Sequence, residues 1–260
     1  MDDDEEVRVV HIEIDGEPVG PDAARALALS GYWHFTAVQV RQQRARGIDL
    51  HLRRLTEGNR ELFDAPLDED EVRRNVRHAL GDTQDASVRV MMCLPGPGED
   101  IGMIVTVRPP AQQPTRPMRL TAVDYLRPVA HIKHSGGFGQ TYYREKAHRA
   151  GFDEILLTAP DGTIAEAGIA NVGLVDEDGT VVWPDGPQLR GTAMSLLQRG
   201  LGGTPVTRTV TVGGLAAYKG MFVTNAHGVA AVEAVDDAKL RVEPVDELNR
   251  LYATMPWETF

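Results

Sequence analysis

Short segments of alternating apolar and polar residues, separated by turn residues, make up most of the first half of the chain. Two stretches with apolar positions at helical spacing interrupt them, and Asp68 or Asp70 is expected to cap the second of these helices. The first alternating segment runs into Asp15-Gly16, a dipeptide typical of hairpin turns. The predicted elements are strands at residues 7–14, 36–41, 47–50, 86–94 and 101–108, and helices at residues 51–63 and 69–80.

A cluster of prolines at residues 109–117 is the strongest break in the pattern, and we take it as the domain boundary. The predicted domains are residues 1–110 and 118–260, joined by a linker at residues 111–117. Strands mixed with helices and many hairpins indicate an α+β fold. The elements predicted beyond the linker are strands at residues 119–125, 154–158, 163–165, 171–175, 180–183, 206–210, 221–224 and 229–235, and helices at residues 140–150, from 192 and from 246.

The composition is that of a globular protein with a sizeable core: 260 residues, of which 42% are hydrophobic and 25% charged. A net charge of −11 argues against nucleic acid or an anionic membrane as the partner, because both require a basic surface. The single cysteine, Cys93, stands in an apolar run and is expected in the core. The sequence shows neither a signal peptide nor an apolar run that spans a bilayer, so we expect a cytoplasmic protein.

Three positions suggest a shared chemistry. Lys133 follows an apolar residue and precedes a glycine-rich bend, Glu166 stands in a small apolar stretch, and Thr192 follows Gly191 at a predicted helix start. An amine, a carboxylate and an anion-binding helix end are what pyridoxal 5′-phosphate requires: a Schiff-base lysine, a partner for the ring nitrogen and a phosphate site.

Each of these residues also has a simpler interpretation. Lys133 is alternatively a surface lysine, Glu166 a solvated strand-end residue, Thr192 an ordinary helix cap, and Arg54 an exposed arginine beside Arg53. Histidines flank Lys133, but no carboxylate or cysteine stands at intervals suited to a metal, so no metal site is predicted. The glycines at residues 136–139 lack the spacing of a dinucleotide site.

Taken in order, several motifs resemble the class IV aminotransferases, the fold type IV pyridoxal-phosphate enzymes that include branched-chain and D-amino-acid transaminases and aminodeoxychorismate lyase. No single motif is decisive, but their shared order is a strong signal, and the resemblance covers most of the chain. The motifs are residues 12–17, His51-Leu52-Arg53-Arg54-Leu55, Lys133 with Gly151, Glu166 with Asn171, Leu189-x-Gly191, and residues 222–226.

The resemblance implies a two-domain α+β fold with the cofactor in the interdomain cleft, a barrel-like C-terminal domain that carries Lys133, and a homodimer. Lys133 is then the Schiff-base lysine and proton shuttle, Glu166 the partner of the pyridine nitrogen, and Arg54 a phosphate ligand. The remaining phosphate contacts are expected from the N–H groups of Thr192 and Ala193 and from Thr224, Asn225 and Ala226. Phe35, His134 and Phe138 are candidate substrate contacts.

The sequence departs from the family pattern at several positions. Ala193 and Ala226 replace hydroxyl residues that bind phosphate, and Ala37 replaces a catalytic threonine of the lyases. The preferred function is amino transfer from a small amino acid or amine to a 2-oxo acid. A pyridoxal-phosphate lyase and a non-catalytic relative remain as alternatives. The Arg-x-His pattern that binds the substrate carboxylate in D-amino-acid transaminases is missing, so the substrate is not identified.

Overall fold

The computed structural model describes residues 11–21, 24, 31–94 and 100–260, and its contacts divide the chain into two compact units. The first unit comprises Met1–Ala111, Ile132–Gly136 and Pro256–Phe260, and the second comprises Gln112–His131 and Gly137–Met255. The domain limits given above, 1–110 and 118–260, stay a prediction.

The short segment Ile132–Gly136 belongs to the first unit because its backbone pairs with a strand there. The N–H of Phe35 donates to the carbonyl of Lys133 (2.9 Å), and the N–H of Ser135 donates to the carbonyl of Trp33 (3.1 Å). These two backbone hydrogen bonds attach the segment to that strand.

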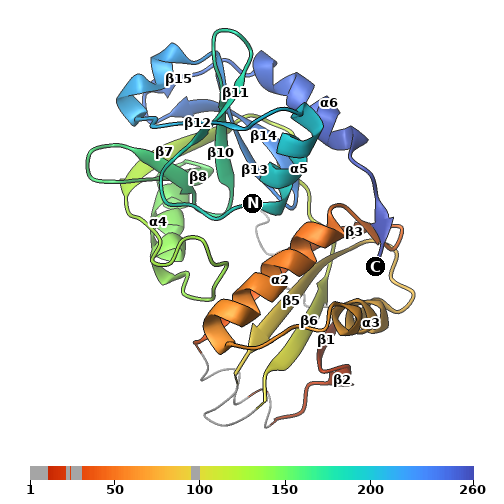
Figure 1. Cartoon of the computed structure of the whole chain (residues 1–260). Coiled ribbons are helices and arrows are strands. Elements are labelled where there is room, and N and C mark those ends of the chain that lie inside the picture. Colours follow the sequence, from red (N-terminus) through yellow and green to blue (C-terminus); the bar gives the residue numbers. More distant parts are fainter. Residues whose placement is uncertain (1–10, 22–23, 25–30, 95–99) are drawn as a thin grey trace. The chain divides into compact units, whose positions relative to one another are not determined.

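A seven-stranded antiparallel sheet forms the body of the first unit, in the order β16-β4-β3-β5-β6-β1-β2. Two helices, α2 (Ile48–Phe63) and α3 (Glu69–Leu80), cover one face of it (Figure 1). The strands are β1 (His11–Ile14), β2 (Glu17–Pro18), β3 (Trp33–Arg41), β4 (Arg44–Ala45), β5 (Ala86–Cys93), β6 (Gly102–Arg108) and β16 (Glu258–Thr259).

Strand alternation gives this sheet two different faces. Val38, Val40, Val88 and Val90 pack against α2 and α3 in the core. The residues of β3 that alternate with Val38 and Val40 point to the opposite face, the far face, together with their cross-strand partners on β5 and β6. Its members include Trp33, Phe35, Ala37 and Gln39 of β3, Arg89 and Met91 of β5, and Ile104, Thr106 and Arg108 of β6.

The second unit contains a nine-stranded mixed sheet in the order β12-β11-β10-β13-β14-β7-β8-β9, with β15 paired to β14. Its strands are β7 (Met118–Asp124), β8 (Glu154–Thr158), β9 (Ile164–Ala167), β10 (Asn171–Val175), β11 (Val181–Pro184), β12 (Val206–Arg208), β13 (Gly220–Asn225), β14 (Gly228–Val235) and β15 (Ala238–Lys239). Its helices are α4 (Phe138–Arg149), α5 (Thr192–Leu201), α6 (Asp246–Thr254) and the 3₁₀ helices η1 (Val212–Ala217) and η2 (Glu243–Val245).

The predicted α+β class is confirmed, as are the helices that follow from periodicity. Asp68 caps α3 as expected, since its carboxylate accepts the N–H groups of Asp70 (2.9 Å) and Glu71 (3.1 Å). Cys93 is buried in the core, as predicted, and burial together with the charge of Asp15 raises its pKa to about 11. No helix in the described part of the chain combines the length and apolarity needed to cross a membrane.

The strand predicted at residues 47–50 is wrong. Gly47 adopts the left-handed conformation (φ 63°) and caps α2, which begins at Ile48. The hairpin instead closes at Gln42 and Gln43, both with positive φ, and its second strand β4 has only two residues. The start of the first predicted strand, residues 7–10, lies outside the described residues.

Candidate active site

Lys133 is held beside strand β3 in the first unit. Residues His34 and His134 pair as an isolated β-bridge, so the lysine is tied to the strand on both sides. Its Nζ lies 4.9 Å from the centroid of the Phe35 ring, a cation–π distance. Lys133 is half-buried, unlike a lysine on a free polar loop.

Next to this lysine, α2 presents a buried histidine and an arginine. His51 is 5% exposed, and burial, followed by the charge of Arg54, lowers its pKa to about 3, with Lys133 contributing in the same direction and Asp49 opposing. His51 is therefore uncharged at neutral pH, and its Nδ1 lies 2.7 Å from the hydroxyl of Thr36.

The same hydroxyl orients Arg54, whose Nη1 donates to Thr36 Oγ1 at 3.5 Å. Arg54 is half-buried whereas Arg53 is exposed, so the structure separates the two adjacent arginines. Because His51 is neutral, the positive charge here comes from Arg54 and Lys133. This part of the first unit is therefore suited to an anion.

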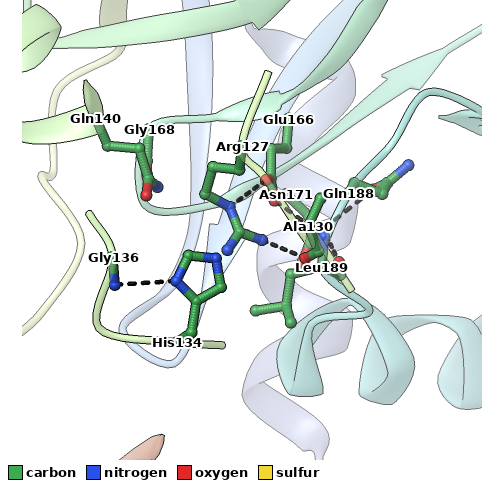
Figure 2. Close-up of polar contacts among 10 residues, drawn as sticks. All are labelled: Arg127, Ala130, His134, Gly136, Gln140, Glu166, Gly168, Asn171, Gln188 and Leu189. Carbon is green, nitrogen blue, oxygen red and sulfur yellow. Dashed lines mark hydrogen bonds and ion pairs between the residues drawn. The ribbon is translucent and has the colours of Figure 1, made fainter. Parts of the chain in front are cut away.

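In the second unit, Glu166 is buried and anchored at both carboxylate oxygens (Figure 2). Arg127 Nε donates to Oε1 at 2.7 Å, and the N–H of Leu189 donates to Oε2 at 3.1 Å. Arg127 also donates through Nη2 to the carbonyl of Ala130, in the loop that leads along the chain to Lys133. Glu166 is not the solvated strand-end residue of the alternative interpretation, because only 5% of it is exposed.

Asn171 holds the loop that contains Gln188 and Leu189. Its Nδ2 donates to the carbonyl of Leu189 (2.6 Å) and to Oε1 of Gln188 (3.0 Å). The N–H of Leu189 is thus bonded by Glu166 and its carbonyl by Asn171. Glu166 in β9 and Asn171 at the start of β10 therefore bind the same residue, Leu189. This gives a physical reason for the four-residue gap between Glu166 and Asn171.

The loop that contains Leu189 leads directly into helix α5. Gly191 is its N-cap, and a Cβ there would lie 1.9 Å from Asn171 Oδ1, so any other residue requires Asn171 to move. Thr192 and Ala193 are the first helical residues, both buried, and the first turn contains no acidic residue. N–H groups at a helix start lack partners within the helix, and the helix dipole favours an anion there.

Replacing Gly191 with alanine is expected to displace Asn171 and the start of α5. Overpacking of this kind lowers the free energy of unfolding by about 1–3 kcal/mol. We also expect weaker binding of pyridoxal phosphate, the cofactor that the sequence resemblance implies, because the N–H groups of α5 move. Calorimetry and spectroscopic titration measure the two effects. Gly213→Ala is the control, since a Cβ there meets nothing within 4 Å; equal behaviour of both variants contradicts the prediction.

The turn between β13 and β14 brings further predicted residues beside Asn171, which pairs with Thr224 across the strands. The Thr224 hydroxyl donates to the carbonyl of Gly228 (3.0 Å), so its hydrogen is already used. Asn225 Oδ1 accepts the N–H of His227 (2.8 Å) and Nε2 of Gln113 (3.1 Å). These bonds order the turn that contains Ala226, and donors for a phosphate at this point must come mainly from the backbone.

The predicted substrate contacts differ in their surroundings. Phe35 lies under the Lys133 amine, as described above. His134 Nδ1 accepts the N–H of Gly136 at 2.9 Å (Figure 2). Phe138 is 83% exposed at the start of α4 and stacks on Tyr142, with ring centroids 6.3 Å apart. The substrate roles of His134 and Phe138 stay predictions.

Sequence reasoning did not identify Arg127 or the role of His51. Arg127 precedes Pro128 in a short segment without periodicity, and its partner Glu166 lies 39 positions away. Its place six residues before Lys133 is the only local signal. For His51, the signal was its position in the motif that includes Arg54.

A model of the family described as "Amino-transferase class IV" matches residues 33–235. No protein among the curated sequences matches the chain. Among solved structures, a hypothetical aminotransferase from Mycobacterium tuberculosis, in its PLP-bound form, is 21% identical with a TM-score of 0.80, covering 93% of this chain and 97% of that one.

Two further solved structures are similar over nearly their whole length. The branched-chain aminotransferase from the thermophilic archaeon Thermoproteus uzoniensis is 17% identical with a TM-score of 0.79, covering 93% of this chain and 93% of that one. The 4-amino-4-deoxychorismate lyase from Pseudomonas aeruginosa is 27% identical with a TM-score of 0.78, covering 92% of this chain and 97% of that one.

Proposed function

Because this chain belongs to the class IV aminotransferase family, we propose that it is a pyridoxal 5′-phosphate-dependent aminotransferase. It transfers an amino group from a small amino acid or amine to a 2-oxo acid, and Lys133 forms the Schiff base with the cofactor. The observation that supports this most is the buried Glu166 carboxylate, fixed by Arg127 and joined through Leu189 to the start of α5.

The residues of each unit fit the chemical groups of this cofactor. Glu166 uses one lone pair of each oxygen for Arg127 and Leu189, so it retains acceptor capacity for a protonated ring nitrogen. The α5 start offers N–H groups without a competing acidic side chain, as a phosphate requires. Gly191 adds no side chain of its own at that start, where a Cβ would lie 1.9 Å from Asn171 Oδ1. Arg54 of the first unit supplies a cation that suits a phosphate.

When bound, pyridoxal phosphate supplies an aldehyde that joins the Lys133 amine and a ring that accepts electrons from the substrate. Lys133 Nζ would hold the cofactor at its aldehyde carbon and would act as the base that takes the proton from the substrate α-carbon and delivers it to that same cofactor carbon. Glu166 stabilises the proton on the ring nitrogen by its charge. Arg127 holds that carboxylate in one orientation, and Asn171 holds the loop before α5.

The proposal is tested by absorbance. Protein loaded with pyridoxal phosphate should show a visible band, and borohydride should remove it and leave the cofactor mass on the peptide that contains Lys133. An amino donor should convert the band, and a 2-oxo acid should restore it. Protein that takes up no pyridoxal phosphate, or that no amino donor converts, refutes the proposal.

A pyridoxal-phosphate lyase is the second candidate. The observation that favours it is the 27% identity to the P. aeruginosa 4-amino-4-deoxychorismate lyase, together with Asn225, which resembles a position of the lyases. Ala37 on β3 opposes it, because a methyl group cannot replace the threonine hydroxyl that assists lyase catalysis. Release of pyruvate without any 2-oxo acid acceptor distinguishes the lyase from the aminotransferase.

The proposal includes a homodimer located in the cytoplasm. The homodimer is supported by the family resemblance, to which the exposed stack of Phe138 and Tyr142 adds apolar surface for a second copy. Sedimentation equilibrium of the loaded protein tests the assembly, and fractionation of cells tests the location. A monomer, or recovery with membranes, contradicts the respective part.

A further inference from the structure

His34 is a buried polar residue that the proposed chemistry does not use. It is 1% exposed on the face of β3 that α2 covers, and its Nε2 lies 2.9 Å from Oδ1 of Asn59 in α2. Asn59 is 2% exposed, and its Nδ2 donates to the carbonyl of Pro66 at 3.4 Å. Because the amide nitrogen of Asn59 is used for Pro66, the amide oxygen faces the ring, and His34 donates through Nε2.

The imidazole of His34 is held in its neutral form. Burial lowers the pKa of His34, and the hydrogen bond to Asn59 opposes this shift only in part. At neutral pH the ring therefore carries one proton, and the bond to Asn59 places it on Nε2. The ring is thus a fixed hydrogen-bond donor between β3 and α2 and not a carrier of protons.

Helix α2 makes room for this ring at a single position. A Cβ on Gly58 would lie 2.4, 2.6 and 2.8 Å from Nδ1, Cε1 and Cγ of His34, which are its three nearest atoms outside the helix backbone. Glycine inside a helix lowers the stability of the helix, so its presence beside Asn59 requires a reason. Gly58 supplies the space for the imidazole, and Asn59 supplies the acceptor. Phe63, one turn further along α2, packs on the same ring with centroids 5.5 Å apart.

The backbone at the same position holds the reactive lysine. His34 pairs with His134 in an isolated β-bridge, and the N–H of Phe35 donates to the carbonyl of Lys133 at 2.9 Å. The side chain of His34 points to α2, whereas that of Phe35 points to the far face, where its ring centroid lies 4.9 Å from Lys133 Nζ. The bond to α2 and the contacts to Lys133 therefore act on adjacent residues of β3.

The helix that fixes His34 also carries Arg54. Arg54 Nη1 donates to the hydroxyl of Thr36, which lies on the same face of β3 as His34. Two neighbouring side-chain contacts thus join α2 to the start of β3. One is next to the Lys133 bridge, and the other orients the cation that suits the phosphate.

We propose that His34, bonded to Asn59 and seated against Gly58, is a positioning residue that sets where the Lys133 amine stands. The inference rests on the proposed function, in which that amine reacts with the cofactor. An isolated bridge has few hydrogen bonds of its own, so it opens easily unless its strand is fixed. The bond to α2 fixes the strand at the residue where the bridge forms. An amine displaced by about 1 Å reacts roughly 100-fold more slowly.

Amide hydrogen exchange of the full chain, before it is loaded with cofactor, tests the positioning directly. The amides to follow are those of Phe35 and Ser135, which form the two backbone bonds between β3 and the Lys133 segment. His34→Leu removes the donor, and exchange at both amides should become about 10- to 100-fold faster. His34→Gln should restore slow exchange to within about threefold, because its Nε2 stands as many bonds from the backbone as the ring Nε2 does.

The amine is followed in the same variants. The rate at which Lys133 attaches to added pyridoxal phosphate, measured by absorbance, should fall by about tenfold or more in His34→Leu. For the loaded enzyme, kcat of amino transfer should fall by a similar factor with KM for the amino donor nearly unchanged, because a misplaced base slows proton transfer without removing a substrate contact. His34→Gln should recover both rates.

Ser87→Ala is the matched control. The Ser87 hydroxyl accepts a hydrogen bond from Gln39 Nε2 at 2.9 Å, so the change also removes a side-chain hydrogen bond of β3, but at the end of the strand away from the bridge. It should lower the melting temperature. Exchange at Phe35 and Ser135 and the rate of cofactor attachment should stay as in the wild type, because a local opening depends on local contacts.

Gly58→Ala tests the same contact from the helix. In the wild-type background the added Cβ displaces the ring of His34, so exchange at the bridge should rise as in His34→Leu. In a His34→Ala background the ring is gone, and the same change should raise the melting temperature because alanine forms helices better than glycine. Equal effects in the two backgrounds would overturn the role assigned to Gly58.

Failure of this inference is distinguishable from failure of the proposed function. If the protein takes up no pyridoxal phosphate, the proposed function fails, and hydrogen exchange still tests the bridge. If His34→Leu leaves exchange at Phe35 and Ser135 and the rate of attachment as in the wild type, the positioning role is overturned while the proposed function stands. A lower melting temperature of His34→Leu with unchanged exchange at the bridge also overturns it, because a purely structural role gives that result.

Discussion

Replacing Lys133 with alanine is expected to reduce amino transfer by about a hundredfold to ten-thousandfold, the range for loss of a positioned proton-transfer group. The variant should still bind pyridoxal phosphate, because the α5 start, Arg54 and Glu166 remain. Borohydride should no longer attach the cofactor to the protein. Single-turnover kinetics measure the rate, and mass spectrometry of the reduced protein measures attachment.

This variant should still fold, because the cation–π contact with Phe35 that it loses is worth only about 0.5–1 kcal/mol at an accessible position. A small added amine should restore part of the rate, since it supplies the missing base. Lys146→Ala on the exposed side of α4 is the control and should match the wild type. Attachment of the cofactor to the protein after borohydride in the Lys133→Ala variant would show that another amine forms the Schiff base.

Replacing Glu166 with alanine should lower the free energy of unfolding by about 3–5 kcal/mol, because it leaves the guanidinium of Arg127 buried without its counter-charge. The effect also includes the lost acceptor for Leu189, which places the loop before α5. Amino transfer should fall as well, since the ring nitrogen of the cofactor loses its partner. Denaturant unfolding measures the stability, and single-turnover kinetics measure the rate.

A double-mutant cycle with Arg127→Ala isolates the pair. Each single change should lower the free energy of unfolding. The double variant should lose less free energy of unfolding than the sum of the two single losses. Additive losses would show that Arg127 and Glu166 act independently. Glu145→Ala, an exposed carboxylate on α4, is the control and should stay within about 0.5 kcal/mol of the wild type.

These expectations share a structural cause. In the second unit, Glu166 connects three features: the guanidinium of Arg127, the peptide of Leu189 and, through that peptide, the start of α5. Asn171 completes the arrangement from the neighbouring strand. Two polar side chains thus position the loop that leads to the proposed phosphate site.

Part of the fold could be predicted because the information is local. The helices α2 and α3 follow from apolar spacing, and the cap of α3 follows from Asp68 ahead of that spacing. The strand predicted at residues 47–50 failed because one left-handed glycine, Gly47, starts a helix there. A backbone conformation of this kind leaves no periodic signal.

For the site, sequence order alone indicated Lys133, Glu166 and the α5 start, because their motifs are contiguous and their residue types are those the chemistry requires. Tertiary structure decided what surrounds them. Arg127 meets Glu166 only after β7 and β9 fold into one sheet, and His51 is neutral only because burial removes water from its ring. Likewise, His34 meets Asn59 only after α2 packs on β3. Partnership and burial depend on contacts between distant positions, which a linear pattern does not contain.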